Sequence, residues 1–218
     1  MEYGVDTRFI TTKSDSTGHA IIAVDTSGEN NILLYSGANH KNTQEAIGAA
    51  LSQANAGDWL LMQNETNNQS YAAATAKTLG LSVGYAAAPF DAQAVQAVMG
   101  SLDLLILNAV EAEQLHQATG QSPAQLPVRD IIVTLGAEGC LWYGIEGQQQ
   151  FEAIAVEPVD TTGAGDTFTG YVLAGLDRGM PMAQAISLGI KAAGLMVTRL
   201  GTADVIPDLK DLQDAQLI

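Results

Sequence analysis

The chain has 218 residues, a mass of 22.8 kDa and a formal net charge of −15. This length predicts one domain, or at most two small ones. The charge excludes a nucleic-acid-binding or anionic-membrane surface, because both require clustered Lys and Arg residues. Hydrophobic residues make up 47% of the chain, which excludes a disordered protein. The one cysteine, Cys140, excludes an internal disulfide and is predicted to be a small buried residue.

Two further features of the sequence bear on the location of the protein in the cell. No stretch reaches the roughly 18 uncharged apolar residues that a membrane span requires. The first residues, Met1–Asp6, have neither the basic region nor the apolar region of a signal peptide. We therefore expect a cytoplasmic protein with no membrane partner and no nucleic-acid partner.

The beginning of the chain predicts a β-hairpin. The apolar segments 18–25 and 31–35 flank the sequence Thr-Ser-Gly-Glu-Asn at 26–30, which is typical of a turn.

From Gly37 onward, helix patterns alternate with strand patterns. This alternation predicts a mostly parallel sheet with helices on both faces, and in such folds ligands bind beyond the carboxyl ends of the strands. The predicted helices are 42–54, 69–79, 92–102, 110–119, 167–178, 181–198 and a short one after Pro207. The predicted strands are 59–62, 81–87, 103–107 and 130–135, followed by a hairpin of 140–145 and 150–156 across Gly147.

The segment Asp160–Phe168, with the sequence DTTGAGDTF, follows a strand and opens a helix. Gly163 and Gly165 allow a sharp turn and a close approach of the backbone to a ligand. A helix N-terminus presents free N–H groups and a positive dipole end, which suit a phosphoryl group. The structural alternative is an ordinary turn with Asp166 as an N-cap. The second glycine and the second acid, Asp160, favour the anion site.

The reaction class follows from what surrounds this segment. Asp166 would be a weak general base, which phosphoryl transfer tolerates because its transition state requires mainly positioning and charge stabilisation. The sequence has no G-x-x-x-x-G-K-[ST] motif and no G-x-G-x-x-G after a strand, which argues against a P-loop enzyme and a nicotinamide-binding protein. His19, His40 and His116 are scattered without metal-ligand spacing.

Asn108 and Glu111 follow a predicted strand and lie three residues apart, on one face of the next helix. A carboxylate there could hold a hydrated Mg²⁺ ion. The same spacing is typical of a capping box, and it recurs at Asn42 and Glu45, where nothing indicates catalysis. The spacing alone favours capping, and both roles can coexist.

Two other strand ends carry weaker signals. Thr134 and Gly136 lie where a strand runs into a glycine turn, which could contact a nucleotide or be only a tight turn. Glu65 follows the predicted strand 59–62 and could accept hydrogen bonds from a polyol, although a solvated loop acid is the ordinary interpretation.

Taken together, these segments resemble the ribokinase (PfkB) family of carbohydrate kinases. DTTGAGDTF is similar to the family's specific C-terminal signature, D-T-x-G-A-G-D-x-F. The other matching segments, in the family's order, are 17–22, 28–30, 36–39, QNET at 63–66, NAVE at 108–111 and TLGAEG at 134–139. The resemblance spans nearly the whole chain. It implies a ribokinase-like three-layer α/β/α fold with a mostly parallel central sheet and a small β-hairpin as a partial lid.

The resemblance implies transfer of the ATP γ-phosphoryl group to a primary hydroxyl of ribose or a similar sugar. Asp166 would take the proton from that hydroxyl. The backbone N–H groups of Gly163, Ala164 and Gly165 would form the anion hole for the transferred group. Glu65 would contact the sugar.

The resemblance also implies a nucleotide site. Asn108 and Glu111 would organise Mg²⁺ and the ATP phosphates, with Glu111 acting on the metal through water. Thr134 and Gly136 would contact the nucleotide, and Lys191 would lie near the adenine.

A monovalent-cation site is implied as well. Asp160 and Thr162, with backbone carbonyls in the segment 196–201, would match the family's site for an ion such as K⁺.

The chain also departs from the family. The family begins with a strand that carries sugar-binding Asn and Asp residues, followed by a G-G-K-G-x-N segment, and the sequence contains neither. We therefore expect a single, N-terminally truncated domain, with residues 1–36 as a partial lid and 37–218 as the nucleotide-binding body. The absent strand is central to the family's sheet, so we expect an exposed apolar flank. The connection 115–130 is shorter than in the family but can hold one crossover helix.

Three functions remain open: a ribokinase-type sugar kinase, a truncated and impaired relative that keeps the nucleotide-binding half, and a relative that phosphorylates a nucleoside or another alcohol. The ribokinase-like residues near Gly18, Glu29 and Asn39 count against the third. A homodimer through the partial lid or through the exposed sheet flank is a further open alternative.

Overall fold

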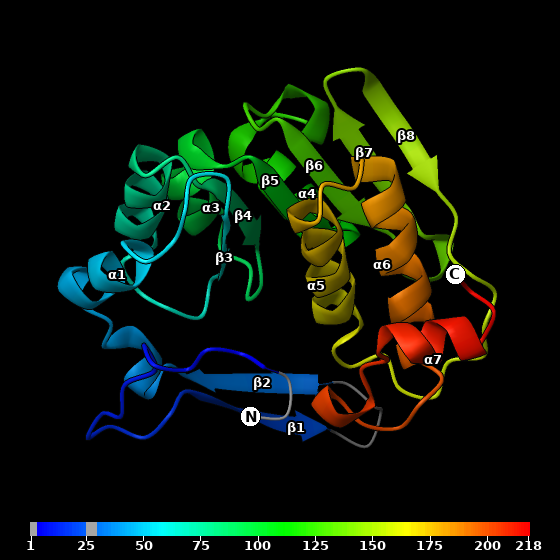
Figure 1. Ribbon diagram of the computed structural model, residues 1–218, viewed down its shortest axis with the longest axis horizontal. Coiled ribbons are helices and arrows are strands. Elements are labelled where there is room, and N and C mark those ends of the chain that lie inside the picture. Colours follow the sequence, from blue (N-terminus) through cyan, green and yellow to red (C-terminus); the bar gives the residue numbers. More distant parts are fainter. Residues whose placement is uncertain (1–3, 25–29) are drawn as a thin grey trace. The chain divides into compact units, whose positions relative to one another are not determined.

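The computed structural model describes residues 4–24 and 30–218 (Figure 1). The chain divides into two compact units. The first runs to Val83 and includes Ala88–Ser101, and the second holds Gly84–Ala87 and Leu102–Ile218. No helix in the described ranges is both long and apolar enough to cross a membrane.

The first unit opens with the predicted hairpin. Strands β1 (His19–Val24) and β2 (Asn30–Tyr35) pair antiparallel, with His19 opposite Tyr35. The hairpin prediction is confirmed for these strands, while residues 26–29 of the predicted turn lie outside the described residues. The hairpin leaves apolar side chains in solvent, among them Leu34, which is 64% exposed.

Helices and one strand follow in the first unit: α1 (Gln44–Leu51), β3 (Trp59–Gln63), α2 (Gln69–Thr78) and α3 (Ala92–Val98). Helix α1 begins later than the predicted residue 42. Its N-cap is Thr43, whose side chain accepts a hydrogen bond from the Ala46 N–H at 3.1 Å. Asn42 instead donates to the Asn39 carbonyl at 2.9 Å, so the Asn42–Glu45 spacing is not a capping box.

The central sheet has six strands in the order β3-β4-β5-β6-β7-β8. Strand β4 (Ser82–Ala86) pairs in parallel with β5 (Leu104–Asn108), and β5 pairs in parallel with β6 (Asp130–Thr134). Strands β7 (Cys140–Gly144) and β8 (Gly147–Phe151) add an antiparallel hairpin at one edge. The sheet is therefore mixed, with a parallel centre as predicted.

Strand β8 is shorter than predicted. The sequence predicts a strand over 150–156 after a turn at Gly147, whereas β8 spans Gly147–Phe151 and therefore also begins earlier than predicted. Among the described strands it pairs with β7 alone, and β7 begins at Cys140, directly opposite Phe151. Residues beyond Phe151 therefore have no strand residue to pair with.

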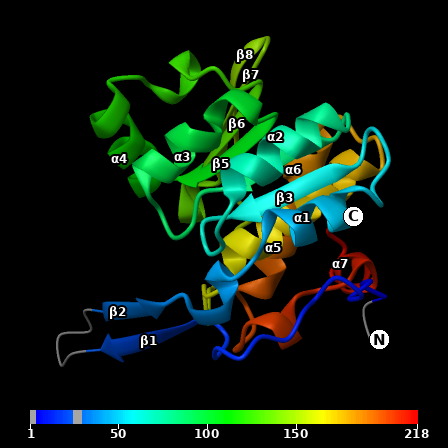
Figure 2. The ribbon, with the colours of Figure 1, turned by 90° about the vertical axis from the view of Figure 1, so that its left-hand side faces the viewer.

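Four helices surround the sheet in the second unit: α4 (Ala109–Thr119), α5 (Ala164–Asp177), α6 (Met182–Met196) and α7 (Leu209–Asp214). Figures 1 and 2 show α4 on one face of the sheet and the α5–α6 pair on the other. The short connection from α4 to β6 holds one 3₁₀ turn, Pro123–Gln125. This arrangement gives the expected three layers.

The parallel strands lie in the buried core. The first four residues of β5 are buried, as expected for a strand covered by helices on both faces. Cys140 is also buried, and the loss of hydration raises the pKa of its thiol to about 11. The prediction of a buried cysteine is thus confirmed.

Candidate active site

The predicted anion-binding segment forms a tight turn that opens α5. Gly163 is the N-cap and adopts a φ of +83°, a conformation that favours glycine. The helix begins at Ala164, three residues earlier than predicted, and therefore includes Gly165 and Asp166 in its first turn. The proposed N-cap role of Asp166 is wrong, because Gly163 holds that position.

The two glycines of the motif have different surroundings. A side chain at Gly163 would place its Cβ 3.0 Å from Cε of Met196. A Cβ at Gly165 would meet nothing within 4 Å, and Gly165 is exposed. Gly163 is therefore needed for the fold of the turn, whereas Gly165 leaves the surface above the helix start open.

The turn is attached to the carboxyl end of α6. The N–H groups of Val159 and Asp160 both donate to the Val197 carbonyl, at 2.7 and 3.1 Å. Thr162 N–H donates to Oδ1 of Asp160 at 2.9 Å, and Gly201 N–H approaches Oδ2 at 3.4 Å. Hydrogen bonds from Thr162 hold the pKa of Asp160 below its ordinary value. The structure therefore brings Asp160 and Thr162 together with the segment that follows α6.

A buried contact lies beneath the turn. Thr167 Oγ1 donates to Sδ of Met196 at 2.7 Å, and both residues are buried. The family resemblance implies backbone carbonyls near Met196, but nothing in the sequence singles out its side chain, since a methionine in a helix is an ordinary core residue. Together with Val197, this contact fixes the turn to the α5–α6 pair.

The N–H groups of the turn are partly used within it. Ala164 N–H donates to the Thr161 carbonyl at 3.2 Å, and Thr167 N–H donates to the carbonyl of the N-cap residue Gly163 at 2.9 Å. The N–H groups at the start of a helix have no partner within the helix. The N–H group of Gly165 is one of these donors, and it is directed out of the start of α5.

Asn108 and Glu111 form the capping box of α4. Asn108 Oδ1 accepts from Glu111 N–H at 2.8 Å, and Glu111 Oε2 accepts from Asn108 N–H at 2.7 Å. The capping interpretation is therefore confirmed. The box uses one carboxylate oxygen of Glu111 and fixes that side chain at the carboxyl end of β5.

Two of the predicted nucleotide contacts lie side by side. Asn108 and Thr134 are direct register partners at the carboxyl ends of β5 and β6. Gly136 follows at the start of a 3₁₀ turn, with a φ of +61°. Lys191 lies on α6 and is half-buried. The carboxyl edge of the parallel strands thus carries Asn108, Glu111, Thr134 and Gly136.

The described part of the chain offers no cage for a divalent metal. Among residues 4–24 and 30–218, no group of three or more His, Cys, Asp and Glu side chains could hold an ion together. A single carboxylate such as Glu111 suits Mg²⁺ when the remaining ligands are water and phosphate oxygens. The residues present therefore fit a Mg²⁺ ion that arrives with a nucleotide.

Glu65 belongs to the first unit, in the loop after β3. Gln69 holds this loop by donating to the carbonyls of Gln63 and Thr66, at 2.8 and 2.9 Å. Asn64 N–H bonds the Ala88 carbonyl at 2.9 Å. Glu65 is exposed on this fixed loop and lines a groove between α1 and β3.

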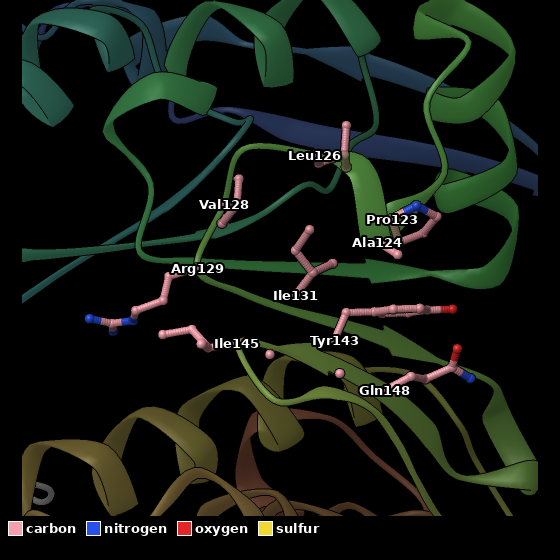
Figure 3. A pocket seen from close by; sticks show the side chains of 11 residues that line it. Pro123, Ala124, Leu126, Val128, Arg129, Ile131, Tyr143, Ile145 and Gln148 are labelled. Carbon is pink, nitrogen blue, oxygen red and sulfur yellow. The ribbon is translucent and has the colours of Figure 1, made fainter.

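A hollow of about 310 Å³ lies away from the motif residues. Figure 3 shows the side chains of Pro123, Ile131 and Tyr143 around it. These residues place it at the amino end of β6, whereas Thr134 is at the carboxyl end. Arg129 lies at its rim and forms a salt bridge with Asp130, with 2.9 Å between Nε and Oδ2. The hollow is mostly apolar and is separate from the candidate active site.

Comparison with known proteins identifies the family. Residues 1–209 match the model described as pfkB family carbohydrate kinase. The chain is 35% identical to a ribokinase from Haemophilus influenzae over 218 residues, which cover 94% of this chain and 71% of that protein. The chain belongs to the pfkB family of carbohydrate kinases.

Solved structures agree in fold. Ribokinase from Thermotoga maritima superposes with a TM-score of 0.80 at 31% identity, covering 93% of this chain and 70% of that one. Ribokinase from Arabidopsis thaliana, solved with ribose and ATP, gives a TM-score of 0.75 at 25% identity, covering 92% and 69%. The predicted ribokinase-like fold is thereby confirmed.

Proposed function

We propose that this chain binds ATP with Mg²⁺ and transfers the γ-phosphoryl group to a primary hydroxyl of ribose or a similar sugar. The observation that carries the proposal is the turn at Asp160–Asp166. It combines an open helix start at Gly165, a glycine-dependent N-cap at Gly163 and an exposed carboxylate, Asp166, in the first turn of α5. The similarity to ribokinases supports the choice of sugar.

Each group of the turn has a role in this proposal. Asp166 accepts the proton of the attacking hydroxyl. The N–H groups of Gly163, Ala164 and Gly165 and the dipole of α5 stabilise negative charge on the transferred phosphoryl group. Ala164 N–H would have to exchange its 3.2 Å bond to Thr161 for a bond to the ligand. Glu65 contacts the sugar, and Asp166 also bonds its reacting hydroxyl.

The second set of groups binds the nucleotide. Asn108 and Glu111 orient the hydrated Mg²⁺ ion, which when bound neutralises charge on the ATP phosphates. Thr134 and Gly136 contact the nucleotide, and Lys191 lies near the adenine. Asp160 and Thr162, with carbonyls in 196–201, hold a monovalent cation such as K⁺. Its role is to fix the turn, and the low pKa of Asp160 keeps a negative charge there.

A second candidate is an impaired relative that binds nucleotide without turning over sugar. The observation behind it is that residues proposed for the nucleotide gather at one edge of the parallel strands, where Asn108 and Thr134 are register partners. The residues proposed for the nucleotide lie within the matched part, so nucleotide binding is common to both candidates.

A coupled assay of ADP formation from ATP and D-ribose separates the two. We expect ribose-dependent turnover in the parent chain and its loss in Asp166→Asn, because the base is removed from the turn. Asp177→Asn is the matched control, since it removes the same charge from the opposite end of α5. Turnover that survives Asp166→Asn contradicts the proposed role of Asp166. Absence of turnover in the parent chain, with ATP binding intact, favours the impaired relative.

The acceptor is tested in the same assay with 2-deoxyribose, fructose and nucleosides in place of ribose. We expect ribose to be the best acceptor. Faster turnover of a nucleoside would instead assign the chain to the third alternative, a kinase for nucleosides or other alcohols.

A further inference from the structure

Helices α5 and α6 lie side by side and pack closely (Figure 1). Two glycines make the close approach possible. A Cβ at Gly189 would stand 2.9 Å from Cγ2 of Val172, and a Cβ at Gly175 would stand 3.0 Å from Cβ of Ala185. Such a tightly packed pair transmits the position of one helix to the other, because a packed interior yields little. Helix α6 is therefore a firm support for α5.

One side chain of α6 contacts both ends of the first turn of α5. Cε of Met196 lies 3.0 Å from the place where a Cβ of Gly163 would stand, and Sδ of Met196 accepts from Thr167 Oγ1 at 2.7 Å. Gly163 is the N-cap, and Thr167 lies four residues later. The two contacts of this buried methionine therefore bracket Gly165 and Asp166.

The hydroxyl of Thr167 bonds across to another helix. A threonine hydroxyl inside a helix commonly bonds the carbonyl four residues earlier, which here belongs to Gly163. That carbonyl accepts from the N–H of Thr167 at 2.9 Å, whereas the hydroxyl donates to Met196 of α6. The contact therefore ties the start of α5 to α6, where an ordinary threonine would tie α5 only to itself.

We propose that Met196 and Thr167 are positioning residues for phosphoryl transfer. Their contact fixes the first turn of α5, and with it the relative positions of the Gly165 N–H group and the Asp166 carboxylate. This inference rests on the proposed function, in which those two groups act on the same ligand. A displacement of about 1 Å in a reacting group can slow a reaction about 100-fold, so a buried contact beneath the turn can control the rate.

Two substitutions remove the contact while keeping apolar packing. Met196→Leu loses the sulfur, and Thr167→Val loses the hydroxyl but keeps the branched shape. In the ribose assay each should lower kcat at least about fivefold, while KM for ATP and for ribose stays within about twofold, because only alignment in the transition state is lost. The double variant should be no slower than the slower single variant, since both substitutions remove the same contact.

Three further variants separate positioning from a general loss of packing. Thr167→Ser keeps the hydroxyl and should retain kcat within about twofold of the parent chain. Thr169→Val removes the hydroxyl of another buried threonine of α5, and Met182→Leu makes the methionine exchange at the other end of α6. Both should leave kcat unchanged. An equal loss of kcat in Thr167→Ser and Thr167→Val, or a double variant whose loss is the product of the single losses, would overturn the inference.

Hydrogen exchange tests the same contact without turnover. The amide of Thr167 reports whether the first turn is closed, because it bonds the Gly163 carbonyl. Its exchange should become at least about tenfold faster in Met196→Leu and stay unchanged in Met182→Leu. Unchanged exchange in Met196→Leu, or an unchanged kcat in both single variants, overturns the inference. A parent chain without ribose turnover contradicts the proposed function instead, and the exchange measurement then decides the inference by itself.

Discussion

At the scale of single residues, the motif contains two glycines with separable roles. Gly163 has a positive φ and a close neighbour in Met196, whereas Gly165 is helical with open space where its Cβ would be. A residue in the left-handed region costs of order 1–3 kcal/mol when it is not glycine. A glycine inside a helix costs stability relative to alanine. The same substitution should therefore act in opposite directions at the two positions.

We predict that Gly163→Ala lowers the free energy of unfolding by about 1–3 kcal/mol. Gly165→Ala should leave stability unchanged or raise it by up to about 1 kcal/mol, yet lower turnover at least about tenfold by filling the space above the helix start. Thermal unfolding and the ribose assay measure the two effects. Gly170→Ala is the control, because Gly170 is a second open glycine of α5 and lies beyond its first turn. Full activity in Gly165→Ala would contradict the proposed phosphoryl position.

Residue chemistry was predictable where it depends on local sequence. The capping box of Asn108 and Glu111 and the burial of Cys140 follow from spacing and from an apolar surrounding. The contact of Thr167 with Met196 does not follow from local sequence, because the two residues lie 29 positions apart and meet through the packing of α5 on α6. The N-cap of α5 was also not predicted, since Gly163 occupies that position through its left-handed backbone conformation and makes no side-chain hydrogen bond.

At the scale of elements, α4 combines a structural cap with a proposed catalytic function. Glu111 accepts a backbone hydrogen bond through one oxygen. In the proposed site its carboxylate would also supply a charge for Mg²⁺. An amide oxygen can accept the same hydrogen bond without carrying the charge. The cap and the metal function are therefore separable by one substitution.

We predict that Glu111→Gln keeps the melting temperature of the parent chain within about 3 °C, since the cap is preserved. The concentration of Mg²⁺ that gives half-maximal turnover should rise at least about tenfold, because the carboxylate charge is lost. Glu113→Gln on the same helix is the matched control and should change neither quantity. An unchanged Mg²⁺ requirement in Glu111→Gln would leave Glu111 as a cap alone.

The order of elements was predictable because the apolar patterns are strong and the strands short. The residues at which each helix and strand begins and ends were less predictable. Helix α5 starts at Ala164 because the turn places Gly163 in the left-handed region, and β8 stops at Phe151 because β7 provides no partner beyond Cys140. Such limits are set by a neighbouring element and cannot be deduced from the segment itself.

At the scale of the whole molecule, charge constrains how a nucleotide can be held. The chain has nine Lys and Arg residues against 24 Asp and Glu residues. In the proposed site, bound phosphate would therefore depend on backbone N–H groups, the dipole of α5 and Mg²⁺, and not on a basic surface. The resemblance to ribokinases led to the family and the fold, but the sequence pattern alone could not predict the strand order, because that order depends on tertiary pairing.

The most direct test of this account is a calorimetric titration of the parent chain with ATP, with and without Mg²⁺. It applies to both an active kinase and an impaired relative, since the nucleotide site is part of both proposals. We predict binding of one ATP per chain in the presence of Mg²⁺, weakened at least about tenfold when the metal is removed. No binding with Mg²⁺ present, or equally tight binding without it, would contradict the account.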